Sequence, residues 1–252
     1  MKVIRSVVMN LYDELSEKLK RILEKEQLME EDIVINAKTL TAKEAIGDTK
    51  RKDFPILTGK EVMLEAEFRG AIGQSFTSYP ASYKGTLKEV LSLDIQKDQH
   101  ATGIFIAALN AIMKHLNLIE GTIHCKNEEP ERCGEKFREY IRKNYGNPKI
   151  TLIGYQPAML ENLSSEFTVR VLDLDEQNIG KRKHGVMVEH GIEAYQEAVL
   201  KWSDIVLCTG STIANGSIVN FLDIGKPVIF YGTTIAGAAT LLNLDRACFF
   251  PG

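Results

Sequence analysis

The sequence predicts an α/β protein in two parts: a small α+β unit over residues 1–95, followed by a parallel-sheet unit over residues 96–252. Two observations predict this class. From residue 150 onward, short continuous apolar runs alternate with helical segments, which is typical of strands buried on both faces of a parallel sheet. Earlier in the chain, "EVMLEAEF" alternates apolar and acidic residues, as a half-buried strand of an antiparallel sheet does.

Composition sets the broad class of protein. The chain has 252 residues, of which 44% are hydrophobic and 26% charged, as in ordinary globular proteins. A net charge of -3 provides no overall basic surface, so we expect no nucleic-acid partner. No segment has the apolar length of a membrane span, and the first residues lack the apolar core of a signal peptide. We therefore expect a cytoplasmic protein without a membrane partner, whose four cysteines are free thiols.

The first part should begin with an amphipathic helix over residues 6–27, where leucines recur at helical spacing. Residues 31–49, "EDIVINAKTLTAKEAIGDT", then suggest two short strands, and residues 61–68 a third. The stretch "RGAIGQSFTSYPASYKG" is rich in Gly, Ser, Pro and Tyr, which indicates a loop. Thr86 is placed to cap a short helix over "LKEVLSLD" that closes this part.

The second part should begin with a long helix over residues 101–116, which has a wide apolar stripe and Asp98 at its start. A charged helix follows over "EKFREYIRKNYG". Four strands are expected at "KITLIGY", "FTVRVLDLD", "SDIVLCTGS" and "KPVIFYGTT", with "ACFFPG" as a fifth. Intervening helices are expected at "PAMLENL", "HGIEAYQEAVLKW", "NGSIVNFLDIG" and "IAGAATLLN".

The strand ends are the candidate binding positions, because ligands of parallel sheets bind outside the carboxyl ends of the strands. These ends carry Gly154–Pro157, Asp173–Asp175, Thr209–Ser217 and Tyr231–Thr234. Glycines and hydroxyl residues there let backbone amides approach an anion such as a carboxylate or a phosphate. The same residues also serve as caps and tight turns in any such fold, so both interpretations stay open.

Other features are weaker signals. "GYQPAM" lacks the glycines of the dinucleotide fingerprint, so we expect no conventional NAD or FAD site, and Asp173 fits a solvated strand end. The basic run Lys181–His184 should lie in a long loop, either solvated or attracting an anionic ligand. The loop Gly73–Tyr79 suits a site wall or a surface turn. Asn110, within the apolar stripe, needs a hydrogen-bond partner and could brace a loop or touch a ligand.

"GTIHCKNEEPERCG" contains residues that soft metals prefer, namely His124, Cys125 and Cys133. Their spacing does not match a metal motif, because no C-x-x-C exists in the chain and neighbouring residues of a strand point to opposite faces. The stretch is better interpreted as a connector whose glutamates begin the next helix. His124 and Cys125 could still face a cleft and bind a metal.

Several motifs together resemble a known family. "GQSFT", "AALNA", "LIGYQPAML" and "CTGSTIANGS" followed by "YGTT" occur in the order found in the two-domain heavy-metal chelation family, and the resemblance covers nearly the whole chain. It implies an N-terminal domain like that of enolase, then a Rossmann-like domain, with a site in the cleft between them. Relatives are expected to carry Gly-Pro-Ser at the fourth strand end, where this chain has Gly-Thr-Thr. By matching positions, the cleft would use Gly73, Phe76, Thr77, Asn110, Gly154, Tyr155, Thr209, Gly210, Ser211, Asn215, Gly216, Ser217, Gly232, Thr233 and Thr234.

Three functions stay open. The first is binding of a small anionic metabolite or metal chelate in the cleft, with a role in heavy-metal chelation and a transition metal or chelate as cofactor. The second is an enzyme of unknown class acting on a small anionic substrate there, with Tyr155, Asp173 and His184 as acid–base candidates; no nucleophile elbow, zinc-protease motif or P-loop is present. The third is direct metal binding through Cys and His. A scaffold without a pocket and a homo-oligomer also stay open.

Overall fold

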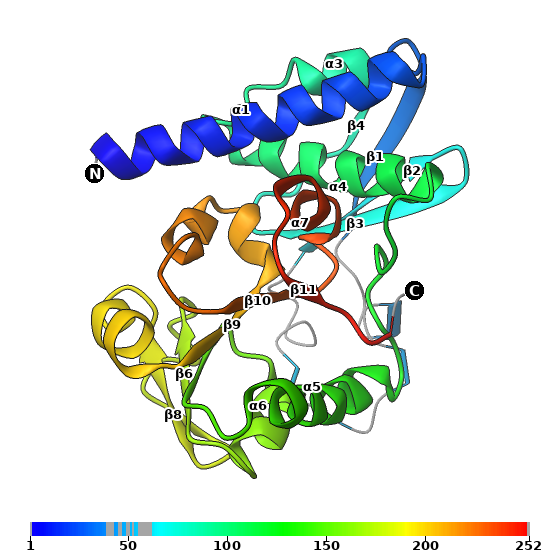
Figure 1. Cartoon of the computed structure of the whole chain (residues 1–252). Coiled ribbons are helices and arrows are strands. Elements are labelled where there is room, and N and C mark those ends of the chain that lie inside the picture. Colours follow the sequence, from blue (N-terminus) through cyan, green and yellow to red (C-terminus); the bar gives the residue numbers. More distant parts are fainter. Residues whose placement is uncertain are drawn as a thin grey trace.

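The structure, a computed structural model, describes residues 2–38, 43–44, 47–48, 51, 53–54 and 62–250. It contains a four-stranded antiparallel sheet and a seven-stranded, mainly parallel sheet, which confirms the α/β class. In Figure 1 the long helix α1 and the antiparallel sheet lie at one end, the parallel strands with α5 and α6 lie at the other, and α4 lies between. Among the described residues, no helix is long and apolar enough to cross a membrane.

The first part contains α1 (Lys2–Lys25), β1 (Asp32–Lys38), β2 (Val62–Phe68), β3 (Ala71–Thr77), β4 (Tyr83–Thr86) and α3 (Leu87–Leu91). Its strands are ordered β3-β2-β1-β4 and every neighbouring pair is antiparallel. The helix expected at the start of the chain is confirmed, with Leu15, Leu19 and Leu23 fully buried. The alternation in β2 also holds, because Leu64 and Ala66 are buried whereas Glu67 is exposed.

The loop expected over residues 69–85 is wrong, because this stretch forms strands β3 and β4. The glycine that suggested a loop has a packing role instead. A Cβ atom on Gly73 would lie 2.1 Å from the backbone nitrogen of Ala111, so glycine lets β3 approach helix α4 closely. Of the two strands expected over residues 31–49, β1 is confirmed, while most of the second lies outside the described residues and residues 43–44 are helical.

The expected caps are confirmed. Thr86 and Glu89 form a reciprocal capping box at the start of α3, and Asp98 caps α4 (Gln99–His115) by accepting from the backbone N–H of His100. Helix α4 packs against β2 and β3 on one side and against α7 on the other. A domain boundary at residue 95 therefore stays a prediction, since α4 joins both parts.

The long helix expected at the start of the second part is confirmed as α4, and the charged helix that follows it is confirmed as α5 (Glu129–Tyr145). The five expected strands follow as β5 (Ile150–Ile153), β6 (Val169–Asp173), β9 (Ile205–Thr209), β10 (Val228–Tyr231) and β11 (Arg246–Ala247). Two of the intervening helices are α-helical, namely α6 (Pro157–Ser164) and α7 (Ala236–Leu242). The other connections use a π-helix, Gln196–Trp202, and two short 3₁₀-helices, Gly210–Ile213 and Ser217–Phe221.

The basic run Lys181–His184 was expected in a long loop, and this prediction is wrong. The run lies in a hairpin formed by β7 (Arg182–Lys183) and β8 (Val186–His190). Strand β8 lies parallel to β6 and buries Val188 against Val171. Pairing with β8 thus imposes strand structure on the basic residues Arg182 and Lys183 of β7.

The strand order is β11-β10-β9-β5-β6-β8-β7, so β5, the first of these strands along the chain, lies at the centre of the sheet. From β5 the chain builds outward through β6 to β8, then returns to the other side of β5 and builds β9, β10 and β11. This is the order of a doubly wound α/β sheet, and it reverses between β5 and β9. Such a reversal separates the two crossover connections and leaves a crevice position at the carboxyl edge of the strands.

The hydrophobic core is continuous between the two parts. One cluster includes Leu15 and Phe105 from the first helices together with Val206, Phe230 and Ile235 from the parallel-sheet part. A second cluster covers the opposite face of the parallel sheet and contains Phe137, Leu152, Leu160 and Leu207. The two parts are therefore packed firmly around α4 and α7.

Candidate functional site at the carboxyl edge of the parallel sheet

The ends of β5, β9 and β10 meet at the point where the strand order reverses. Gly154 has φ of 83°, and a Cβ atom there would lie 2.9 Å from Cγ2 of Thr209. The Tyr231 hydroxyl donates to the carbonyl oxygen of Ile153 at 2.9 Å and lies 3.2 Å from that of Gly154. The structure thus brings the predicted residues Gly154 and Thr209 into contact and fixes them from β10.

Strand β3 of the first part reaches the same edge at the end of β10. The backbone N–H of Phe76 donates to Oγ1 of Thr234 at 3.0 Å. The Phe76 ring meets the His124 ring edge-on, with centroids 5.5 Å apart. Beside it, Thr233 is 5% exposed and its hydroxyl is buried without a hydrogen-bond partner. Predicted residues far apart in sequence therefore meet here.

Asn110 holds this contact together from within α4. Its amide nitrogen donates toward the carbonyl oxygens of Gln74 (2.9 Å), Thr233 (3.2 Å) and Thr234 (3.2 Å). Its amide oxygen accepts from the backbone N–H of Gly237 at 2.8 Å. The side chain is fully buried, so Asn110 braces β3 against the loop between β10 and α7.

The remaining residues predicted on β3 are also engaged in packing. Gly73 and Thr77 face α4, where Thr77 side-chain atoms lie 3.4 Å from the Cβ position of Gly103. Gln74, which belongs to the expected loop Gly73–Tyr79 but not to the positions matched to the family, accepts with its side chain from the backbone N–H of His124 at 2.7 Å. Its own backbone N–H donates to Thr122, so the connector after α4 occupies the outer edge of β3.

His124, Cys125 and Cys133 of the connector are the candidate metal ligands of the sequence. Among the described residues, no three His, Cys, Asp or Glu side chains are arranged to hold a metal ion. Cys125, Cys133 and Cys248 are free, half-buried thiols. Burial, with the neighbouring Cys248 thiol, raises the pKa of Cys133 to about 12, and burial likewise raises the pKa of Cys125. Each raised pKa increases the free energy needed to form the thiolate that metal ligation requires.

The predicted residues after β9 lie in two different regions of the structure. Thr209 lies at the switch point, and Gly210 packs closely against Ile235. Asn215 and Gly216 instead line a hollow of about 90 Å³ beside Tyr12 of α1 and the start of α4. Ser217 donates to the Asn215 side chain from both its backbone and its hydroxyl. Ser211 is half-buried between these places.

Tyr155, directly after β5, differs from its neighbours because its hydroxyl is buried and has no hydrogen-bond partner. Its backbone N–H donates to Asp173 at 3.1 Å. The Asp173 carboxylate also accepts from the backbone N–H groups of Leu174 and Asp175 and from the Asn178 amide. Asp173 is therefore a turn-forming residue with its oxygens already occupied.

Sequence reasoning missed an ion cluster that joins the first part to α6 and the β7–β8 hairpin. Arg51 donates to both oxygens of Asp53, at 2.8 and 2.7 Å, and also to Glu161. His184 Nε2 lies 3.3 Å from the Asp53 carboxylate. Burial alone would raise the pKa of Asp53, but the hydrogen bonds and charge of Arg51 outweigh it and hold the pKa below its usual value. Nothing in the local sequence marks these residues, because only the tertiary fold brings them together.

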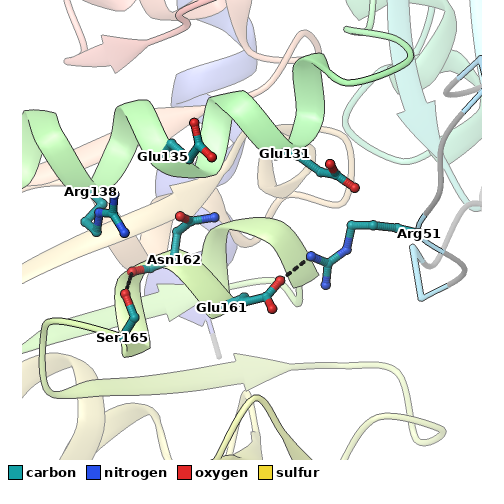
Figure 2. A pocket seen from close by; sticks show the side chains of 7 residues that line it. All are labelled: Arg51, Glu131, Glu135, Arg138, Glu161, Asn162 and Ser165. Carbon is teal, nitrogen blue, oxygen red and sulfur yellow. Dashed lines mark hydrogen bonds and ion pairs between the residues drawn. The ribbon is translucent and has the colours of Figure 1, made fainter.

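Figure 2 shows a shallow hollow beside this cluster, between α5 and α6. Its volume is about 330 Å³, and Arg51 points across its rim to Glu161. Glu131, Glu135 and Arg138 line it from α5. Charges of both signs alternate around its wall, so it has no clear preference for an anion or a cation.

The fold and the switch point define the class: an α/β protein whose candidate binding edge lies where a doubly wound sheet reverses. Residues 139–244 match the model of the DUF364 family, described as "Putative heavy-metal chelation". This match lies within the second part, and over these residues it confirms the family resemblance seen in the sequence.

Two solved structures of proteins with unknown function from the DUF364 family are similar to this chain. One, from Pyrococcus horikoshii, is 16% identical with a TM-score of 0.53, and the alignment covers 88% of this chain and 79% of that protein. The other, from Desulfitobacterium hafniense DCB-2, is 12% identical with a TM-score of 0.49, and the alignment covers 73% of this chain and 71% of that protein. A comparison with curated proteins gives no match. The Pyrococcus structure supports the fold over both parts of the chain.

Proposed function

We propose that this protein binds a small anionic molecule, a metabolite or a metal chelate, where β3 of the first part meets the carboxyl edge of the parallel sheet. The observation that carries the proposal is the reversal of strand order between β5 and β9, with Gly154 and Thr209 in contact across it. Ligands of doubly wound sheets bind at this position, and glycine and hydroxyl residues suit an anion. The same strand order supports a Rossmann-like character for residues 96–252.

The contact between Phe76 and Thr234 supports a site that uses both parts of the chain. Thr233, next to it, has a buried hydroxyl that no group of the described residues satisfies. A ligand oxygen would give this hydroxyl a partner, since buried polar groups are normally hydrogen-bonded. Thr233 is therefore a hydroxyl residue that we expect to contact the ligand. Ser211, in the loop after β9, is the second candidate, and among the described residues its hydroxyl accepts only a long hydrogen bond of 3.4 Å from Thr209.

The family description suggests that the ligand is involved in heavy-metal chelation. A metal bound as a chelate fits this chain better than a bare metal ion. The thiols of Cys125 and Cys133 have raised pKa values, and within the described part of the chain no three His, Cys, Asp or Glu side chains are arranged to hold a metal ion. An enzymatic reaction on the bound anion, a cytoplasmic location and a homo-oligomer stay predictions.

Isothermal titration calorimetry with citrate, Ni²⁺ and the preformed Ni²⁺–citrate chelate tests the proposal. We expect citrate or its chelate to bind and Ni²⁺ alone not to bind. In the Ser211→Ala, Thr233→Ala double variant, loss of hydrogen bonds to a charged ligand should weaken binding by about tenfold or more.

Ser165→Ala with Thr168→Ala, at exposed positions near the opposite edge of the sheet, is the matched control and should leave affinity unchanged. Binding of Ni²⁺ alone, lost on Cys125→Ser, would instead favour direct metal ligation. Unchanged affinity for citrate or its chelate in the double variant would count against the proposed contacts.

A further inference from the structure

Within the described part of the chain, two hydrogen-bond donors without protein acceptors lie together beside the switch point. Lys183, at the end of β7, holds its ammonium nitrogen 5.5 Å from the centroid of the Tyr155 ring. This is a cation–π distance, so the aromatic ring orients the lysine. Among the described residues, Lys183 forms no ion pair, unlike its neighbour His184.

The Tyr155 hydroxyl is the second donor. Tyr155 is 7% exposed, and its oxygen is buried with no hydrogen-bond partner. Burial, together with the Asp53 carboxylate, raises the pKa of Tyr155 to about 12, so the phenol remains protonated at neutral pH. A buried hydroxyl is normally satisfied, and an unsatisfied one next to a site calls for an acceptor from outside the protein.

Nearby carboxylates do not supply that acceptor. Asp173 accepts from four N–H donors around the β6 turn. Asp53 and Glu161 are both held by Arg51. The acidic groups near Tyr155 are thus already engaged with other partners, whereas the phenol and the Lys183 ammonium are not.

We propose that Tyr155 and Lys183 together hold one oxyanion of the ligand, a carboxylate or a phosphate group. The phenol donates a hydrogen bond to one oxygen, and the ammonium supplies the opposite charge. This assigns a role to one residue of the basic run, because the Arg182 guanidinium donates to the Gly185 carbonyl and Lys181 is exposed. The inference rests on the proposed function and specifies the charged end of its ligand.

The test measures binding of citrate and of inorganic phosphate to the whole protein by isothermal titration calorimetry. Tyr155→Phe removes only the hydroxyl, and Lys183→Met removes the charge while keeping most of the chain length. Each should weaken binding of the preferred anion by about tenfold, as expected for loss of one hydrogen bond to a charged group. Lys181→Met, in the same basic run, is the matched control and should bind like the wild type.

A second readout separates ligand binding from a structural role. Because Tyr155→Phe removes an unsatisfied buried hydroxyl, its urea midpoint without ligand should equal or exceed that of the wild type. Wild-type binding that persists unchanged in both Tyr155→Phe and Lys183→Met would overturn the inference but leave the proposed function intact. Failure of the wild type to bind either anion would overturn both.

Discussion

Replacing Asn110 with Ala should destabilise the protein strongly, because this residue joins three segments from a fully buried position. The substitution removes the 2.8 Å bond from Gly237 and the 2.9 Å bond to Gln74, and it leaves both backbone groups without a partner. Each unsatisfied buried group costs about 1–3 kcal/mol, so we expect the free energy of unfolding to fall by about 3–5 kcal/mol. The two longer bonds share the remaining amide hydrogen and add less.

Urea unfolding with linear extrapolation measures this change. Asn144→Ala is the matched control, because Asn144 is an exposed helical asparagine whose amide donates to a single carbonyl, that of Tyr140. Its loss should stay within about 0.5 kcal/mol. If Asn110→Ala lay within about 1 kcal/mol of Asn144→Ala, the bracing role of Asn110 would be refuted.

A second variant, Asn110→Asp, tests the direction of the Asn110 hydrogen bonds through the pH dependence of stability. Its carboxylate could still accept from Gly237 but would place a second oxygen against the carbonyls of Gln74, Thr233 and Thr234. Burial and this repulsion should raise the pKa of the new carboxyl, so the destabilisation should be largest near neutral pH and shrink as the pH falls and the carboxyl protonates. A pH-independent loss would contradict the assigned geometry.

Three further predictions follow from local contacts. Gly73→Ala should lower the free energy of unfolding by about 3 kcal/mol, because the added Cβ meets the backbone nitrogen of Ala111 at 2.1 Å; a near-normal urea midpoint would refute this. Thr86→Ala should cost about 1 kcal/mol in the same assay through loss of the α3 cap, while Thr86→Ser should retain the cap. The pairing of Asp53 with Arg51 lowers the Asp53 pKa, so its stabilisation should be present above about pH 4 and lost as the pH falls further; the stability difference between wild type and Asp53→Asn, followed against pH, should shrink accordingly.

Strong local signals in the sequence predicted most of the parallel-sheet part correctly. The apolar runs at Ile150–Ile153 and Ile205–Thr209 are buried on both faces, so composition alone identifies them. Caps such as Thr86 and Asp98 are equally local, because a side chain bonds its own helix.

The sequence-based predictions were wrong where tertiary contacts override the local amino-acid composition. Strand β3 contains Gly73 and hydroxyl residues that favour a loop, yet its packing on α4 and pairing with β2 make it a strand. The β7–β8 hairpin is similar, because its pairing with β6 cannot be inferred from a run of basic residues. The ion cluster of Arg51, Asp53 and Glu161 joins distant segments and has no sequence signature.

The hydrogen bonds within the protein distinguish candidate ligand contacts from structural residues better than a residue's position at the edge of the sheet does. A group whose bonding capacity is used within the protein has little left for a ligand. Asn110 and Thr234 are committed to joining the two parts of the chain, and Gly73 is committed to close packing. Thr233 and Tyr155, by contrast, bury hydroxyls that have no hydrogen-bond partner in the part of the chain that the structure describes. Substitution of Thr233 or Tyr155 should therefore change ligand affinity with little change in stability, whereas substitution of Asn110 or Gly73 should change stability.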